Sequence, residues 1–175
     1  HELASRGAFV TLLDCRGVGL GATQASAGML VPFLEGSGRP ILPLAAKSLD
    51  MYDAFVERIS GDSGIDVGYR RTGSLQVATA DEPLGELQGI AADATAAGLE
   101  CELLDADGAR DAEPQLTPDV HAALLIRSHG FVGAAGLSEA LSAAAVRRGA
   151  IVRAPARAER IARRGDSIEI QLGDG

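Results

Sequence analysis

The sequence predicts an α/β protein that combines a partial parallel sheet with an inserted α+β lobe. The first observation is an internal echo between residues 3–10 (LASRGAFV) and 145–152 (AVRRGAIV), where a helix ends at Arg-Gly and an apolar strand follows at once. Two such units fit parallel neighbours in one sheet. The echo also has a simpler interpretation, because Arg-Gly-Ala is common where helices stop. The second observation is that residues 41–132 carry paired strands and amphipathic helices of their own.

The composition is that of a folded globular protein. Of the 175 residues, 46% are hydrophobic and 23% are charged, which argues against disorder. The formal net charge of -8 disfavours nucleic-acid binding through a general basic field. No apolar run approaches the roughly 20 residues that span a bilayer, so no membrane partner is expected. The two cysteines lie far apart without metal-ligand spacing, which favours a reduced, cytoplasmic protein with no metal site.

The first elements along the chain predict part of the sheet and its connection. Residues 2–7 have the pattern of the last turns of a helix, with a glycine at the stop. Residues 8–14 (AFVTLLD) are mostly apolar, which predicts a strand buried on both faces, as in a parallel sheet. Residues 16–28 are rich in Gly, Ala, Thr and Ser and predict a loop that leads into a short helix.

Residues 41–132 predict the inserted lobe. Residues 42–60 follow a helical pattern, with Leu49, Val56 and Ile59 on one side, and residues 61–64 contain the glycines expected to end this helix. The other elements are bounded mainly by glycine or proline. They are strands at 67–72, 74–79, 100–104 and 120–126, and helices at 83–97 and 105–113.

The last segment returns to the parallel sheet. Residues 136–148 predict an Ala-rich helix that Gly149 stops. Strands are expected at 150–153, 157–162 and 167–172. Because the sequence opens on a helix end and closes on a strand followed by a turn, we expect the chain to be an internal piece of a larger protein.

Asp14 is the first candidate binding residue. In dinucleotide-binding folds, an acid at the carboxyl end of a buried strand accepts hydrogen bonds from a ribose hydroxyl. From position alone, an ordinary strand-end Asp in a turn is an equally good interpretation.

Residues 17–22 (GVGLGA), which follow Asp14 closely, fit the Gly-x-Gly-x-x-Ala pattern of a loop that would bind NAD, with Glu35 downstream. Pro32 argues against a second central strand there, and a flexible connection is favoured.

The run of small side chains at residues 22–30 (ATQASAGML) is the second candidate. Small side chains let backbone N–H groups approach a ligand closely, and a helix N-terminus here would favour a phosphate oxygen. A small-residue helix packed tightly in a core is the alternative. Cys15 has no His near it in sequence, so we interpret it as a small packing residue and not as a nucleophile.

Four segments together resemble the FAD-dependent amino-acid oxidase family, in order over nearly the whole chain. Residues 3–14 look like the end of the first helix and the second strand of a Rossmann-type FAD-binding domain. Residues 22–32 are similar to the family's Thr-x-Ala-x-Ala-Gly-Met-Leu segment, and residues 68–75 to its Tyr-x-x-x-Gly-x-Leu strand pair. Residues 113–137 are similar to its Glu-Pro and Gly-x-Val-x-Pro-x-x-Leu region, with Ala134 where Pro is usual. The glycine oxidase branch, which serves thiamine biosynthesis, gives the nearest likeness.

The resemblance implies a division of the chain and contacts for the adenosine half of FAD. Residues 1–40 and 133–175 would be a partial FAD-binding domain, and residues 41–132 part of the substrate-binding lobe. Asp14 would bind the adenosine ribose, where the family more often has the longer Glu. Cys15 and Arg16 would line the adenine side. Ala158 would contact adenine through its backbone.

The resemblance also implies contacts for the rest of the cofactor. Ala22 and Thr23 would approach the pyrophosphate or ribityl region. Ala27, Gly28 and Met29 would lie beside the isoalloxazine ring through backbone groups. No catalytic side chain is implied, because the flavin itself takes a hydride from the substrate.

The reaction that the resemblance implies is the oxidation of glycine or a similar small amino acid or amine to its imine, with O2 reduced to H2O2. A D-amino-acid dehydrogenase and a sarcosine-oxidase-like flavoenzyme are the alternative enzymes. A truncated, non-catalytic homologue is the alternative of another class. The expected partner is the small amino-acid or amine substrate, and a homo-oligomer is left open.

Overall fold

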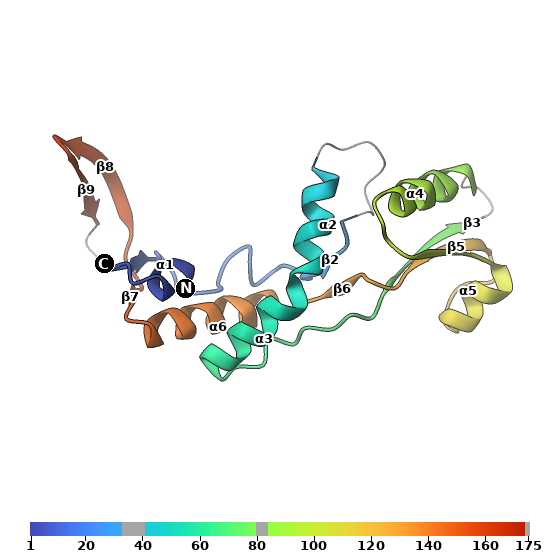
Figure 1. Cartoon of the computed structure of the whole chain (residues 1–175), viewed down its shortest axis with the longest axis horizontal. Helices are drawn as coiled ribbons and strands as arrows, with labels where there is room; N and C mark the ends of the chain where they lie inside the picture. Colours follow the sequence, from blue (N-terminus) through green and yellow to red (C-terminus); the bar gives the residue numbers. More distant parts are fainter. Residues whose placement is uncertain (33–40, 80–83, 174–175) are drawn as a thin grey trace. The chain divides into compact units, whose positions relative to one another are not determined.

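The computed structural model describes residues 1–32, 41–79 and 84–173, and its elements are labelled in Figure 1. The chain divides into two compact units. Unit 1 comprises His1–Gly28, Ala54–Gly68 and Gly133–Gly175, and unit 2 comprises Met29–Asp53 and Tyr69–Val132. Which unit serves a cofactor and which a substrate remains a prediction.

Unit 1 contains the predicted parallel pair of strands. Its elements are α1 (Glu2–Ser5), β1 (Thr11–Leu13), most of α3 (Tyr52–Ser63), α6 (Ala134–Arg147), β7 (Ile151–Arg153), β8 (Ala158–Arg164) and β9 (Ser167–Leu172). β1 pairs with β7 in parallel, with Thr11 opposite Ile151. Ala4 and Ala145, one from each of the two similar segments, pack in one apolar cluster with Ala150. The echo therefore marks two neighbouring helix–strand units, as predicted.

The surroundings of β1 differ from the prediction of a strand buried on both faces. Phe9 is fully exposed and Leu12 is 44% exposed. Among the described residues, β7 is the one strand that pairs with β1. Most of the apolar surface of β1 is therefore not covered by the described part of the chain.

The segment after β1 also differs from its prediction. Residues 21–25 form turns, and no helix occurs between residues 14 and 32 of the described chain. Met29–Leu30 form the short strand β2 in place of a helix. The helix N-terminus predicted to bind a phosphate at residues 22–30 is therefore wrong, and so is its alternative, a small-residue helix packed in a core. The NAD-binding interpretation of residues 17–22 is wrong too, because it also needs a helix directly after the loop.

Unit 2 is built around a three-stranded antiparallel sheet in the order β3-β5-β4. Its elements are β2 (Met29–Leu30), α2 (Leu42–Asp50), β3 (Ser74–Thr79), α4 (Leu84–Ala96), β4 (Cys101–Asp105), α5 (Ala106–Ala112), β5 (Val120–Ile126) and β6 (Gly130–Phe131). α4 covers one face, with Ile90 packed in a cluster with Leu124, and α5 covers the other, with Ala109 clustered with Ala123 (Figure 1). The predicted strands at 74–79 and 120–126 are confirmed with the same bounds.

Two predictions in this region are wrong. The helix predicted over 42–60 is two helices, α2 and α3, separated at Met51, and α3 continues through Gly61 to Ser63. Gly64, with a φ of 75°, is the glycine that ends it. The strand predicted over 67–72 is reduced to a single bridge between Arg70 and Phe131.

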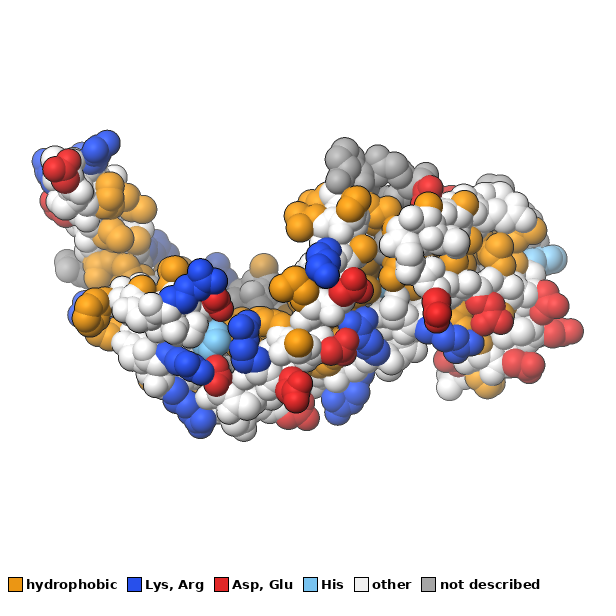
Figure 2. Space-filling view, viewed as in Figure 1, with side chains coloured by type: hydrophobic (Ala, Val, Ile, Leu, Met, Phe, Trp, Pro, Cys, Tyr) orange, Lys and Arg blue, Asp and Glu red, His pale blue; other side chains and the backbone are white. Residues whose placement is uncertain are grey.

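The C-terminal hairpin of unit 1 carries exposed apolar side chains. β8 and β9 pair antiparallel, with Ile161 opposite Ile170. Ile161 and Ile168 are 68% and 62% exposed, and Figure 2 shows hydrophobic side chains along this hairpin. The strand predicted over 157–162 is confirmed in a longer form, and the one over 167–172 has the same bounds.

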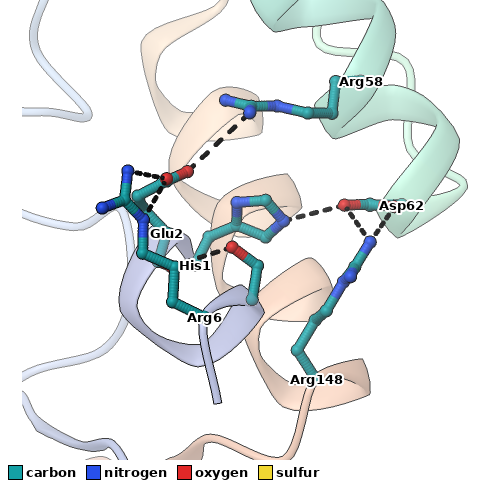
Figure 3. A network of polar contacts seen from close by, with 7 residues as sticks. His1, Glu2, Arg6, Arg58, Asp62 and Arg148 are labelled. Atoms are coloured by element: carbon teal, nitrogen blue, oxygen red, sulfur yellow. Dashed lines mark hydrogen bonds and ion pairs between the residues drawn. The ribbon is translucent and has the colours of Figure 1, made fainter. Parts of the chain in front are cut away.

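A polar network ties three helices of unit 1 together (Figure 3). The Asp62 carboxylate of α3 lies 2.8 Å from His1 Nε2 and accepts hydrogen bonds of 2.9 and 3.0 Å from Arg148, just after α6. Glu2 pairs with Arg6 at 2.8 Å. Asp62 therefore fixes the end of α3 against α1 and α6, within the unit that holds Asp14. In the described residues, no helix is both long and apolar enough to cross a membrane.

Candidate functional site

Asp14 follows the last residue of β1 and shapes the turn after it. Its Oδ1 accepts hydrogen bonds from the backbone N–H groups of Arg16, at 2.8 Å, and Gly17, at 3.0 Å. These bonds lower the pKa of Asp14 below its ordinary value, because they stabilise the charged form. Oδ2 has no hydrogen-bond partner among the described residues. Asp14 is thus a turn residue that keeps one carboxylate oxygen available to a ligand, so both interpretations of the sequence fit.

The connection between β7 and β8 lies against the same strand end. The N–H of Asp14 donates to the Arg153 carbonyl at 3.0 Å, and the N–H of Ala156 donates to the Asp14 carbonyl at 2.7 Å. Ala158 begins β8 two residues later. The structure therefore brings residues 153–156 next to Asp14, a contact that carries no signal in the sequence.

The neighbours of Asp14 on the predicted adenine side are exposed. Cys15 is an exposed free thiol, so its interpretation as a packing residue is wrong. Cys15 lies in the bend that follows β1 and is not covered by the described residues. Arg16 is also exposed, and its guanidinium would meet a side chain placed on Gly21 at 2.9 Å. Both residues remain predictions as cofactor contacts.

The small-residue segment exposes its backbone. Ala22 and Ala27 are exposed, and Thr23 and Gly28 are half-buried. Gly28 has a φ of 68°, a conformation that residues with side chains rarely adopt, and its N–H donates to Ser26 Oγ at 3.1 Å. The segment is therefore held by local turns and offers main-chain groups to a ligand, without the helix that the sequence predicted.

Met29 belongs to unit 2, where it opens β2. It pairs with Phe131 of β6, and Leu30 pairs with Gly130. The Met29 side chain is 62% exposed. Its backbone is thus fixed by the short β2–β6 ladder while its side chain stays accessible. No group of three His, Cys, Asp or Glu residues able to hold a metal occurs in the part of the chain that is described.

Comparison with known proteins adds a family to this geometry. Residues 1–174 match the family model described as FAD dependent oxidoreductase. The chain belongs to this family of FAD-dependent oxidoreductases.

Individual relatives match most of this oxidoreductase chain. It is 33% identical over 151 residues to glycine oxidase of Geobacillus kaustophilus, and 27% identical over 164 residues to an opine oxidase subunit of Rhizobium meliloti. These alignments cover 85% and 91% of this chain, but 40% and 44% of the two relatives. The crystal structure of the Geobacillus glycine oxidase superposes with a TM-score of 0.90 at 30% identity, over 98% of this chain and 46% of that one. The likeness confirms the predicted α/β fold class.

The residues present fit the family's cofactor, FAD. A ribose presents hydroxyl donors, and Asp14 offers a charged acceptor with one oxygen outside the turn. A flavin and its phosphates need close approach to main-chain N–H groups, and the exposed segment 22–28 has only small side chains and Gln24 in the way. The fit rests on these side-chain and backbone types, and each individual contact stays a prediction.

Two polar groups of this oxidoreductase chain gave no functional signal in the sequence. Arg71 lies inside the Tyr-x-x-x-Gly-x-Leu segment, but its partners lie up to 57 residues away. His129 is fully buried beside Ser74, with 2.7 Å between its Nδ1 and the Ser74 hydroxyl. The sequence could have shown only that each of the two residues lies within two positions of a glycine that precedes or opens a strand.

Proposed function

We propose that the chain serves in the FAD-dependent oxidation of a small amino acid, with glycine as the expected substrate, to the corresponding imine. The match of residues 1–174 to the FAD-dependent family, together with the available carboxylate oxygen of Asp14, carries this proposal. The 33% identical relative named glycine oxidase supports the substrate class. The chain spans 40% of that relative's length, so the activity is proposed for the protein to which these residues belong.

The proposed reaction removes two electrons and two protons from the substrate. The α-carbon loses a hydride and the nitrogen a proton, so that a C=N bond forms. FAD, when bound, accepts the hydride and transfers the two electrons to O2, which takes up two protons and becomes H2O2. The protein's part is to bind and orient the two reactants.

We propose the following contacts for the residues of this chain. Asp14 accepts the ribose hydroxyls, and Cys15, Arg16 and Ala158 line the adenine. The other contacts are made mainly by main-chain groups. Those nearest the pyrophosphate or ribityl chain belong to Ala22 and Thr23, and those beside the isoalloxazine ring to Ala27, Gly28 and Met29.

The first test is a flavin titration of the purified chain, followed by fluorescence quenching and the visible spectrum. Saturable binding of FAD by the chain is the expected result, and peroxide formed from glycine and O2 is expected of the longer protein to which these residues belong. Reduction of a dye by D-alanine without peroxide would favour a dehydrogenase instead. Saturable binding of NAD in place of FAD would contradict the proposal.

Replacing Asp14 by Asn separates its two roles. The Asn carbonyl oxygen can still accept the turn hydrogen bonds from Arg16 and Gly17, but the charged acceptor for the ribose is lost. We expect the Kd for FAD to rise about tenfold to a hundredfold, with little change in the melting temperature. Asp111→Ala, at an exposed site in α5, is the control. Equal FAD affinity in the two variants would show that Asp14 only shapes the turn.

A further inference from the structure

The Arg71 guanidinium joins three separate segments of unit 2. Its Nε and Nη2 donate to the Asp53 carboxylate at distances from 2.6 to 3.1 Å. Nη2 also donates to the Leu49 carbonyl at 2.8 Å, and Nη1 donates to the Ser128 carbonyl at 2.5 Å. The side chain is only 25% exposed. A planar guanidinium can reach acceptors in several directions at once, which a lysine ammonium on its flexible stem cannot do in the same geometry.

The Asp53 side of this arrangement is itself held in place. The Tyr69 hydroxyl donates to Asp53 Oδ1 at 2.9 Å. Tyr69 stacks on Tyr52 with 6.0 Å between ring centroids, and the Arg71 guanidinium lies 6.0 Å from the centre of the Tyr69 ring. The hydrogen bond from Arg71 is the main cause that lowers the pKa of Asp53. A charged carboxylate and an aromatic face therefore orient the guanidinium toward the Ser128 carbonyl.

The Ser128 side leads directly into β6. Arg70 and Phe131 exchange backbone hydrogen bonds of 3.0 and 2.9 Å, and the Gly73 N–H donates to the His129 carbonyl at 2.9 Å. Residues 70–73 thus run along one edge of residues 129–131, while β2 pairs with the other edge through Met29 and Phe131. A guanidinium bound to the Ser128 carbonyl fixes the point from which β6 starts.

We propose that Arg71 is a positioning residue, which holds β6 and through it the Met29 backbone of β2. The part that concerns flavin rests on the proposed function, which sets Met29 beside the isoalloxazine ring. Arg71 acts through the main chain of β6 and makes no contact with cofactor or substrate in this role. Its neighbour Arg70 has the same charge, but within the described part of the chain its side chain donates only to the adjacent Tyr69 carbonyl, so Arg70 is a matched control.

Hydrogen exchange by mass spectrometry tests the positioning role without flavin. In Arg71→Ala, peptides that contain residues 29–30 and 130–131 should exchange at least about tenfold faster than in the unaltered chain, because local opening there becomes easier. Arg71→Lys should show a smaller increase, and Arg70→Ala none. Residues 151–153, in the β1–β7 ladder of unit 1, should be unaffected in all variants. If all peptides of unit 2 exchange fast in Arg71→Ala because the unit has unfolded, the test rests on the comparison of Arg71→Lys with Arg70→Ala. Equal exchange at 29–30 in those two variants would overturn the proposal.

A second measurement tests the connection to flavin. With FAD added, Arg71→Lys should raise the Kd for FAD about tenfold and shift the visible spectrum of the bound flavin, while Arg70→Ala should do neither. If Arg71→Lys exchanges faster at residues 29–30 but leaves the flavin spectrum and the Kd for FAD unchanged, the proposed link from β2 to the isoalloxazine ring is overturned. If the unaltered chain binds no FAD, the proposed function fails, but the exchange comparison still decides whether Arg71 holds the β2–β6 ladder.

Discussion

Replacing Gly130 by alanine should lower the free energy of unfolding of this chain by roughly 3–5 kcal/mol, the largest effect expected of any single methyl group here. The added Cβ would lie 3.0 Å from Arg71 Cα and closer still to the Arg70 carbonyl oxygen. Both neighbours are backbone, which cannot turn aside as a flexible side chain can. β6 would have to move away from residues 70–73 and lose the paired hydrogen bonds between Arg70 and Phe131.

Tyrosine fluorescence during urea unfolding would measure this effect in unit 2 alone. The chain has two Tyr and no Trp, and both tyrosines, Tyr52 and Tyr69, belong to unit 2. Gly89→Ala is the matched control, because Gly89 lies in α4 and an added Cβ meets nothing within 4 Å. This second substitution should stabilise the chain by about 0.5–1 kcal/mol, as alanine does in an exposed helix. A Gly130→Ala protein within about 1 kcal/mol of the unaltered chain would contradict the close approach of β6 to residues 70–73.

The elements that the sequence predicted well are those whose formation is decided locally. The strand 74–79 alternates between the two faces of its sheet, and α6 ends at an Arg-Gly stop, where Gly149 has a φ of 90°. The echo between residues 3–10 and 145–152 correctly gave a parallel pair, because it repeats a whole helix–strand unit. In each case the side-chain pattern and the glycine positions suffice to specify the backbone.

The elements that it predicted poorly depend on partners far away in the sequence. β2 and β6 have two residues each, too few for any periodicity, and exist because each supplies the other's partner. The break at Met51 occurs where the Leu49 carbonyl accepts a hydrogen bond from Arg71, and a helical pattern in residues 42–60 cannot reveal a donor in another segment.

The candidate site likewise has features that the sequence could predict and features that it could not. Asp14 could be selected from its place at a strand end, since an acid there is chemically suited to ribose. The contact of Ala156 with Asp14 could not, because it involves only main-chain atoms. The small-residue segment was found from its composition, but its turns depend on Ser26 and the glycine conformations, so the predicted helix was wrong although the accessible backbone was expected.

Acidification should destabilise unit 2 through His129. Burial lowers the pKa of His129 from 6.5 to about 4, because the charged imidazolium is poorly solvated inside the protein. The unfolded chain therefore takes up this proton at a higher pH than the folded chain. The stability that His129 contributes is complete above about pH 6.5 and falls as the pH drops through 6.5 towards 4.

The size of this effect can be isolated with His129→Gln, which removes the titrating group and keeps an amide able to bond the Ser74 hydroxyl. Between pH 7 and pH 4, the unaltered chain should lose up to about 3 kcal/mol relative to this variant, at about 1.4 kcal/mol per pKa unit. Urea unfolding followed by tyrosine fluorescence at a series of pH values would give the difference. His121→Gln, at an exposed position of β5, should keep the pH dependence of the unaltered chain. Parallel pH profiles for the unaltered chain and His129→Gln would mean that the folded chain accepts the charge on His129, and would refute its burial as a neutral imidazole.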